Sequence, residues 1–295
     1  MIDQADNLRN LLNNTNKKER VSLDLSARVI TVTSGKGGVG KTNFSVNLAI
    51  QFSKMNKKVV IIDADFGLAN IEVIFGIMPR YSLANVLKGE KDIEDVLTDG
   101  PFGIKFISGG SGLKELTNIT EKQMSYFINN FSYLDAIFDI IIIETGAGIS
   151  KSVVNFIKAS DETIIVTTPE PTSITDAYAL IKTIKEERDH MPKFKMVVNR
   201  VDDEEEGAEI YEKINRASGK FLNVEIEDLG CIPYDRYLVK AVKKQEPASM
   251  LYPNCSFTKA LEKIGSKMMD IDYVEASQNV GIKGFMKRLV NIFNN

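Results

Sequence analysis

A glycine-rich loop with two lysines carries the clearest chemical signal in this sequence. Gly35, Gly40, Lys41 and Thr42 match the phosphate-binding pattern G-x-x-x-x-G-K-[ST]. Glycines let backbone N–H groups turn toward a phosphate chain, and the N-terminus of a following helix adds partial positive charge. In this pattern the lysine reaches the β- and γ-phosphates and the hydroxyl binds Mg²⁺. The loop therefore predicts a nucleotide–magnesium site formed by Gly35, Lys36, Gly37, Gly38, Val39, Gly40, Lys41, Thr42 and Asn43.

Carboxylates follow two other apolar runs. Asp63 and Asp65 come directly after residues 59–62, and Glu144 ends the most apolar run, at residues 138–143. Continuous apolar runs are typical of parallel strands covered on both faces. Open α/β sheets bind ligands at the carboxyl ends of such strands. Carboxylates at that edge suit a magnesium site, although paired aspartates after a strand are also a common turn signal.

The elements that must position these residues alternate between strands and helices. Strands are predicted at residues 28–33, 59–62, 102–108, 138–144, 161–168 and 193–200, and helices at residues 43–52, 122–135, 173–185 and 256–269. This alternation predicts an α/β fold, a mostly parallel twisted sheet with helices on both faces and the nucleotide at the carboxyl ends of the strands.

Composition narrows the function classes. The 295 residues are 43% hydrophobic and 26% charged, ordinary values for a globular protein, and the net charge of −3 argues against a nucleic-acid partner. Only Cys231 and Cys255 occur, without a C-x-x-C pair and with a single histidine in the chain. This disfavours a structural zinc site and indicates a reducing, cytoplasmic setting. Neither a secretory signal nor an apolar run of about 18 residues is visible.

The run K-G-G-V-G-K-T at residues 36–42 resembles the deviant Walker A loop of the MinD/ParA class of P-loop ATPases. The resemblance implies a homodimer with bound ATP, in which Lys36 reaches the partner's nucleotide; a solvated loop lysine is the alternative. The run D-x-D-x-G-L-x-N at residues 63–70 also matches the class. It implies that Asp65 orients the attacking water and contacts the Mg²⁺ shell, while Asp63 supports the metal. The implied catalytic residues are Lys36, Lys41 and Asp65, and the implied metal residues are Thr42, Asp63, Asp65 and Glu144.

The same resemblance extends to the γ-phosphate and to the base. Gly146 is expected to place its N–H near the γ-phosphate. The family usually has aspartate where this chain has Glu144, a departure that puts the hydrolysis rate in doubt more than nucleotide binding. Asn199 ends a V-x-N-[RK] strand and is implied to read the adenine edge beside Arg200; a structural strand cap is the alternative. The G-x-I-P-x-D loop is implied to close over adenine through Ile232, Pro233 and Asp235.

The N-terminal segment adds a second resemblance. It contains the run D-Q-A-x-x-L-R, similar to the leader of FlhG (YlxH) proteins, the MinD relatives that control flagellar number; its fixed positions are Asp3, Gln4, Ala5, Leu8 and Arg9. In that family the leader binds the SRP-type GTPase FlhF and stimulates GTP hydrolysis, with the glutamine entering the GTPase site. FlhF and flagellar basal-body or C-ring proteins are therefore the implied partners. A disordered leader with a chance match is the alternative.

The C-terminal segment has a basic and apolar composition. Apolar residues recur at helical spacing, namely Ile282, Phe285, Met286, Leu289, Val290 and Phe293, and Lys283, Lys287 and Arg288 supply charge. This pattern is typical of an interfacial membrane helix, and MinD and FlhG relatives carry one at the same end. It predicts reversible, peripheral binding to an anionic membrane surface, reinforced by dimerisation. A helix docked on its own domain is the alternative, and the two states can alternate.

These patterns together predict three regions: a leader and linker at 1–22, a MinD-like ATPase domain at 23–269, and a linker with a membrane helix at 270–295. The predicted function is an ATP-hydrolysing, Mg²⁺-dependent, dimerising switch that cycles between ATP and ADP and regulates flagellar number or placement. A MinD-type division-site regulator would share the ATPase and tail but lack the leader. A ParA-type partition ATPase would need basic surface patches, and an iron–sulfur carrier would need paired cysteines.

Overall fold

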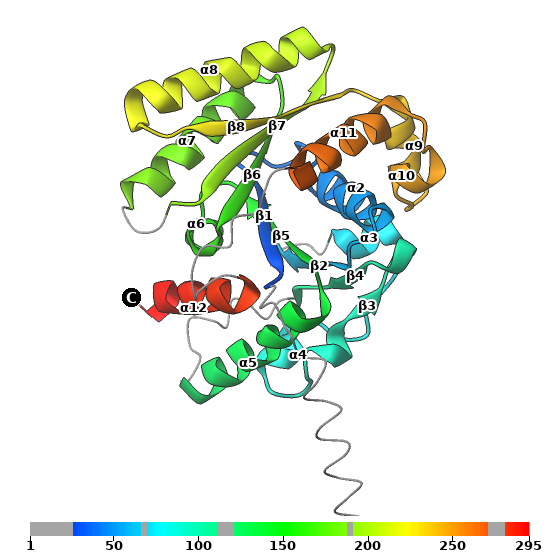
Figure 1. Cartoon of the computed structure of the whole chain (residues 1–295), viewed down its shortest axis with the longest axis vertical. Coiled ribbons are helices and arrows are strands. Elements are labelled where there is room, and N and C mark those ends of the chain that lie inside the picture. Colours follow the sequence, from blue (N-terminus) through cyan, green and yellow to red (C-terminus); the bar gives the residue numbers. More distant parts are fainter. Residues whose placement is uncertain (1–25, 66–69, 111–120, 188–190, 271–280, 295) are drawn as a thin grey trace, which may run out of the picture.

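An eight-stranded sheet forms the centre of the molecule (Figure 1). The computed structural model describes residues 26–65, 70–110, 121–187, 191–270 and 281–294. The strand order is β3-β4-β2-β5-β1-β6-β7-β8, and only β3 runs antiparallel to its neighbour. The strands are β1 (Arg28–Ser34), β2 (Val59–Ala64), β3 (Thr98–Asp99), β4 (Lys105–Ile107), β5 (Ile140–Ala147), β6 (Glu162–Thr167), β7 (Lys193–Val201) and β8 (Ile226–Pro233).

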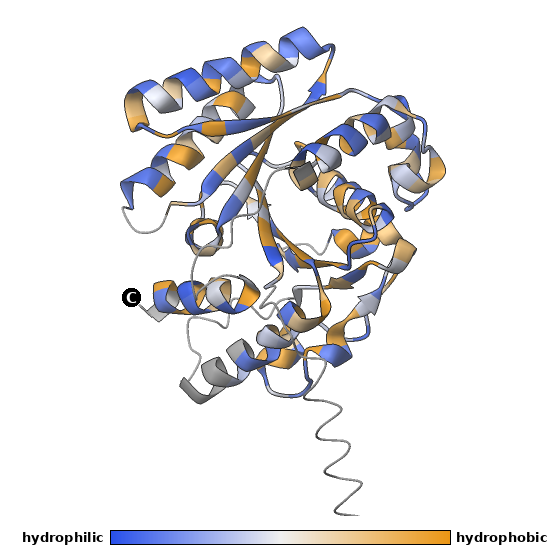
Figure 2. Cartoon of the chain, viewed as in Figure 1, coloured by the Kyte–Doolittle hydropathy of each residue, from blue (hydrophilic) through white to orange (hydrophobic). Residues whose placement is uncertain are grey.

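Helices cover both faces of the sheet, so the predicted α/β fold class is confirmed (Figure 1). One face carries α2 (Lys41–Lys54), α3 (Ile71–Phe75), α9 (Arg236–Lys243), α10 (Ala248–Leu251) and α11 (Ser256–Asp270). The other carries α4 (Leu83–Leu87), α5 (Glu121–Ile137), α6 (Lys151–Ala159), α7 (Pro171–Glu186), α8 (Glu204–Leu222) and α12 (Gly281–Asn294). Every strand and helix predicted from the sequence overlaps one of these elements. Hydropathy follows the layers, because apolar residues line the strands and the inner faces of the helices (Figure 2).

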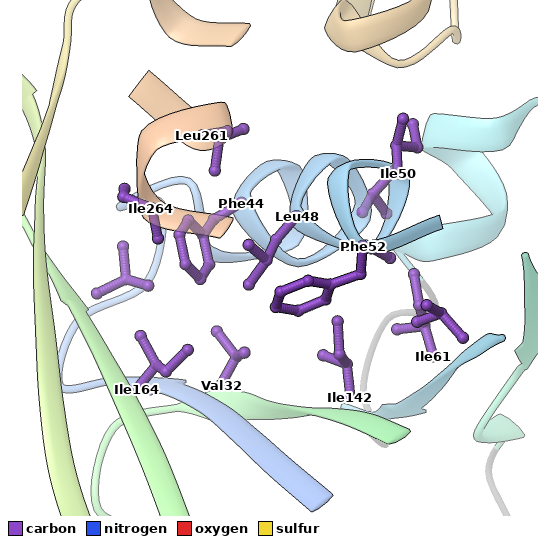
Figure 3. Close-up of a cluster of buried hydrophobic side chains, with 14 of the residues drawn as sticks. Val32, Phe44, Leu48, Ile50, Phe52, Ile61, Ile142, Ile164, Leu261 and Ile264 are labelled. Atoms are coloured by element: carbon purple, nitrogen blue, oxygen red, sulfur yellow. The ribbon is translucent and has the colours of Figure 1, made fainter. Parts of the chain in front are cut away.

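Helix α2 is held against the sheet by a row of large apolar side chains. Phe44, Leu48 and Phe52 are fully buried, and their spacing of four residues places them on one helical face. Figure 3 shows them directed at the strands that carry Val32 and Ile142. Burying each such side chain contributes roughly 1.5–3 kcal/mol. The loop between β1 and α2 is therefore fixed at both of its ends.

Helix α12 is docked on its own domain, which is the alternative to a membrane-bound helix that the sequence left open. Four apolar side chains of its inner face, Ile282, Phe285, Met286 and Leu289, are at most 2% exposed, and they join the cluster formed by β2, β5, α4, α5 and α6. The Phe285 ring lies 6.0 Å from the Phe156 ring of α6. The side chain of Phe293 lies outside the described residues. The face predicted to enter a membrane is thus part of the core in this state.

No helix in the described part of the chain combines the length and the apolar character needed to cross a bilayer.

A buried ion network joins the amino ends of three strands. The Arg28 guanidinium donates to both carboxylate oxygens of Glu162, at 2.7 and 2.8 Å, and Lys195 lies 3.0 Å from the same carboxylate. Arg28 also donates to the carbonyl of Met268 at 2.6 Å, which ties the end of α11 to the sheet. Burial disfavours the charged form of Glu162, yet Arg28 and Lys195 outweigh it and hold the pKa of this carboxyl below its usual value.

We predict that Glu162→Gln lowers the free energy of unfolding by about 3 kcal/mol at pH 7, because it removes the buried carboxylate that Arg28 and Lys195 share. Since the folded pKa is depressed, this stabilisation is present above the ordinary pKa of 4.5 and is lost as the pH falls through the folded pKa. Urea unfolding at pH 7 and pH 4 measures both effects. The control is Glu227→Gln, whose partly exposed carboxylate lies 3.2 Å from the Lys195 ammonium. Equal losses for the two variants would contradict the assignment.

Candidate nucleotide-binding site

The phosphate loop lies between β1 and α2, at the carboxyl edge of the sheet. Gly38 and Gly40 have φ angles of +79° and +93°, a backbone region that side chains other than glycine rarely adopt. A Cβ on Gly35 would lie 2.3 Å from the backbone of Asp176 in α7. Glycine is therefore required at these positions by conformation and by packing, and the loop backbone stays free to approach a phosphate chain.

Asn199, at the end of β7, braces this loop. Its side-chain nitrogen donates to the carbonyl of Val39 at 2.7 Å, and its oxygen accepts from the N–H of Arg200 at 3.0 Å. A Cβ on Gly40 would approach that nitrogen to 2.5 Å. Arg200 has a φ angle of +62° and occupies a β-bulge between Asn199 and Val201. The predicted adenine-reading role stays a prediction; the bracing contact is a role that the sequence did not indicate.

Glu144 lies at the centre of the site and is fully buried. One carboxylate oxygen accepts from the Thr42 hydroxyl at 2.5 Å and lies 3.4 Å from the Lys41 ammonium. The other oxygen has no hydrogen-bond donor among the described residues. Burial raises the pKa of Glu144 to about 7, with Lys41 opposing the shift. A hydroxyl, an ammonium and an incompletely bonded carboxylate meet at the end of a glycine-rich loop, the donor set that fits a nucleotide phosphate with Mg²⁺.

Asp63 fastens the segment that follows β2. Its carboxylate accepts from the N–H groups of Asp65 and Asn70, both at 3.0 Å, and from Ile71 at 3.5 Å. Burial raises the pKa of Asp63 to about 6, although these N–H groups oppose the rise. Asp63 therefore positions the start and end of the segment that carries Asp65. A Cβ on Gly146 would lie 3.5 Å from an Asp65 carboxylate oxygen, so the ends of β2 and β5 meet at this point.

Lys36 is directed at its own chain. Its ammonium contacts the Glu170 carboxylate at 2.5 Å and the Thr172 hydroxyl at 2.8 Å, and its side chain is 36% exposed. The hydrogen bond from Lys36 and its charge hold the pKa of Glu170 below its usual value. The sequence predicted a helix from residue 173, and in the structure α7 begins at Pro171, directly after Glu170. A functional pairing for Glu170 had no local signal, because its partner is 134 residues away.

The predicted adenine loop joins three elements at the same edge. Asp235 caps α9 by accepting the N–H of Tyr237 at 2.8 Å, and it also accepts from the N–H of Phe257 at 3.0 Å. Burial alone would raise the pKa of Asp235, but these two N–H groups and the Ser256 hydroxyl hold it below its usual value. Ile232 is buried in the core behind the loop. The carboxylate thus fixes the loop, and a role with adenine stays a prediction.

The structure brings most predicted site residues to one edge of the sheet: the phosphate loop, Asp63, Asp65, Glu144, Gly146 and Asn199. The leader residues fall outside the described part of the chain: Asp3, Gln4, Ala5, Leu8 and Arg9. Within the described residues, no group of three or more His, Cys, Asp and Glu side chains is arranged to hold a metal by itself. A magnesium ion here would depend on phosphate, hydroxyl and water oxygens as well.

The fold and this site together define a P-loop nucleotide-binding protein with a parallel α/β sheet. Residues 27–196 match a family model described as an AAA domain. The chain is 38% identical over 264 residues to the antiactivator FleN of Pseudomonas aeruginosa, which covers 89% of this chain and 93% of that protein. It is 34% identical over 295 residues to the flagellum site-determining protein YlxH of Helicobacter pylori, covering 98% and 99%. The chain belongs to the MinD/ParA-type P-loop ATPases.

Solved structures show the same fold. The septum site-determining protein MinD of Pyrococcus horikoshii, complexed with Mg-ADP, superposes with a TM-score of 0.68. The match covers 85% of this chain and 99% of that one at 23% identity. The architecture predicted by the resemblance to MinD is therefore confirmed at the level of the fold.

We predict that Glu144→Gln stabilises the nucleotide-free protein at pH 8 and changes little at pH 4.5. The folded pKa of about 7 exceeds the ordinary 4.5, so stability is lost as the pH rises through this window and the buried carboxyl ionises. The expected gain at pH 8 is on the order of 3 kcal/mol. Thermal unfolding at the two pH values measures it, with Glu212→Gln on the exposed surface of α8 as the control. An equal change at both pH values would refute the assigned burial effect.

Proposed function

We propose that this chain is an ATP-hydrolysing, dimerising switch that regulates the number or placement of flagella at the inner face of the cell membrane. Lys36 is the observation that supports the switch best. It belongs to the phosphate loop, yet its side chain is 36% exposed and its ammonium contacts Glu170 of its own chain. The flagellar role is supported by the names of the two relatives, an antiactivator and a flagellum site-determining protein, which match nearly the whole chain.

The first step is binding of ATP with Mg²⁺. Backbone N–H groups of residues 35–42 would hold the phosphates, and the Thr42 hydroxyl would hold the cation. Lys41 would turn from Glu144 to the phosphates. The unsatisfied oxygen of Glu144 would accept a hydrogen bond from a water on the cation, and positive charge there favours the ionised carboxyl. ATP supplies the phosphoanhydride bond that is cleaved.

Hydrolysis needs a water held in position, and Asp65 is the proposed carboxylate for that task. Asp63 contributes indirectly, because its hydrogen bonds to Asp65 and Asn70 hold the segment between them. Gly146, near the end of β5, lies close to Asp65, which follows β2. A γ-phosphate bound at this point can therefore affect both the segment after β2 and the segment after β5. Glu144 replaces a shorter aspartate and already bonds Thr42 directly. That contact must lengthen when a cation enters, which is consistent with slow hydrolysis.

Dimerisation would follow from release of Lys36. Its contacts to Glu170 and Thr172 are exposed, and water and salt weaken exposed ion pairs. The free-energy cost of exchanging these contacts for contacts with the phosphates of a partner's nucleotide is therefore small. A lysine in a phosphate loop that is free to change partners suits a switch better than a permanent dimer.

Membrane binding would require α12 to leave its groove. Lipid hydrocarbon would replace the protein core around Ile282, Phe285 and Leu289, which compensates for lost burial on the helix. The apolar surface of α5 and α6 beneath the helix would still be exposed to water, so release needs a further favourable term. Attraction of Lys283, Lys287 and Arg288 to anionic lipid contributes about 1 kcal/mol each near the surface. Two helices on one dimer bind with avidity. Dimerisation is therefore the proposed event that shifts the balance toward the membrane.

Residues 3–9 are the proposed activator of the SRP-type GTPase FlhF, with Gln4 entering the GTPase site. Basal-body or C-ring proteins are further proposed partners. The support is the D-Q-A-x-x-L-R run together with similarity to the flagellar relatives over nearly full length.

We predict that Asp65→Ala accumulates an ATP-bound dimer and lowers ATP hydrolysis by at least about 100-fold, since a water-positioning carboxylate is lost. Lys36→Ala should bind ATP and remain monomeric. Glu170→Gln should dimerise at lower ATP concentration, because Lys36 is released from its own surface. Size-exclusion chromatography with light scattering, ATP binding and phosphate release measure these outcomes.

Lys54→Ala, an exposed lysine at the far end of α2, is the matched control and should behave as the parent protein. If Asp65→Ala were an ATP-bound monomer, the proposed switch would be wrong.

We predict that a peptide of residues 1–20 stimulates GTP hydrolysis by purified FlhF and that a Gln4→Ala peptide does not. Phosphate release with and without each peptide measures the effect. No stimulation by either peptide would remove the flagellar assignment of the leader and favour a MinD-type division-site regulator, while the ATPase switch would stand on the separate tests above.

A further inference from the structure

One peptide group of the phosphate loop is held by a side chain from a distant strand. Asn199 lies near the end of β7, which is separated from β1 by β6, and its side-chain nitrogen donates to the carbonyl of Val39 at 2.7 Å. Asn199 is 2% exposed and Val39 is 3% exposed, so bulk water has little access to this hydrogen bond. The contact therefore fixes the orientation of the peptide group between Val39 and Gly40.

The planarity of the peptide group extends this constraint to the N–H of Gly40. The peptide bond between Val39 and Gly40 is trans, so its carbonyl and its N–H point in opposite directions. Because the carbonyl is directed at Asn199, the N–H is directed away from it. Backbone N–H groups of this loop are the groups that bind phosphate in the G-x-x-x-x-G-K-[ST] pattern. Asn199 thus determines the direction in which a phosphate-binding donor points.

Without this hydrogen bond, a second orientation of the peptide group would be accessible. Gly40 has a φ angle of +93°, and glycine adopts positive and negative φ angles about equally well. Rotation of the peptide group would turn the carbonyl, with its partial negative charge, toward the side on which the N–H now lies. A Cβ on Gly40 would lie 2.5 Å from the Asn199 nitrogen, so a side chain cannot be added to stiffen the loop at this position. The orientation therefore has to be held from outside the loop.

The amide of Asn199 is oriented in turn by the backbone of residue 200. The amide oxygen accepts from the N–H of Arg200 at 3.0 Å, which leaves the amide nitrogen for Val39. Arg200 lies in the β-bulge between Asn199 and Val201 and has a φ angle of +62°, a conformation that is unfavourable for residues other than glycine. Its side chain is exposed, so burial of the side chain does not explain this conformation. The hydrogen bond from its N–H does.

We propose that Asn199 is a positioning residue that holds the 39–40 peptide group with its N–H available to phosphate, and that the backbone of Arg200 orients Asn199 for this task. This role differs from reading the adenine edge, because it acts on phosphate binding and is independent of the base. The inference rests on the proposed function only in its ligand, a nucleoside triphosphate. It requires neither dimerisation nor a membrane nor FlhF.

The test compares a ligand that has a base with one that lacks it. Isothermal titration of the full chain with Mg-ATP and with inorganic tripolyphosphate gives both affinities. Asn199→Ala and Asn199→Ser remove the amide donor. Asn215→Ala is the matched control, because its amide accepts the N–H of Ile226 at 3.1 Å, at the amino end of β8. Thermal unfolding of each variant checks that it is folded.

Asn199→Ala and Asn199→Ser are expected to weaken the binding of ATP and of tripolyphosphate by the same factor, roughly tenfold to hundredfold, the scale of one lost hydrogen bond to a charged group. Asn215→Ala should bind both ligands as the parent chain does. A crystal structure of the ligand-free Asn199→Ala variant should show the 39–40 peptide group in more than one orientation, which measures the constraint without any ligand.

A second pair of variants separates the backbone of residue 200 from its side chain. Arg200→Gly and Arg200→Val both lack the guanidinium, so any contact of that group with a ligand is lost in both. Glycine adopts a positive φ angle readily, whereas a β-branched valine is strongly disfavoured there. The valine variant should therefore bind both ligands at least about tenfold more weakly than the glycine variant. This pair alters an exposed residue and leaves the buried amide in place.

Unchanged binding of tripolyphosphate in the Asn199 variants, together with weaker binding of ATP, would assign Asn199 to the base and overturn the proposal. Equal affinities of Arg200→Gly and Arg200→Val would overturn the role of the backbone at residue 200. A parent chain that binds neither ligand would overturn the proposed function and this inference together. The first two results leave ATP binding by the parent chain intact, so the two kinds of failure are distinguishable.

Discussion

Burial of the Glu144 carboxylate is the constraint on which the nucleotide site depends. A charge removed from water is tolerated only when it is neutralised or fully bonded, and within the described part of the chain this carboxylate has partners at one oxygen. Its pKa of about 7 places it between the two protonation states at neutral pH. Burial also raises the pKa of the neighbouring Asp63 carboxyl, to about 6. Such a site is incomplete without a cation and phosphate, so nucleotide binding also relieves stored electrostatic cost.

The sheet explains why these groups meet. Parallel strands end at one edge, so Glu144 at the end of β5 and Asp63 at the end of β2 lie beside the loop that follows β1. The brace from Asn199 extends this edge to β7. Helix α2 fixes the loop from the other side through its buried aromatic and aliphatic face. The phosphate loop is thus held by the core before any ligand binds.

The docking of α12 on the domain depends on interactions of a different kind from those of the nucleotide site. It depends on apolar burial, which has no direction, and on a few polar contacts at the ends of the helix. Lipid could cover the apolar face of α12 after release but not the surface of α5 and α6 beneath it, so apolar burial favours the docked state. The carboxylate of Asp135 brings the start of α12 beside the start of β1, because it accepts from the N–H groups of both Lys283 and Ala27.

Local patterns in the sequence were sufficient for the phosphate loop, the strand ends with Asp63 and Glu144, the fold class and the amphipathic tail. These features depend on residues close together in the chain, whose spacing reports backbone geometry directly. The tertiary structure alone decided that Lys36 pairs with Glu170, that Asn199 braces Val39, that Arg28 pairs with Glu162 and that Asp135 caps α12. Each of these contacts spans more than 130 residues, and its partners are brought together only when the crossover helices pack. Periodicity carries no information about such pairs, because their geometry is set by the packing of the whole domain.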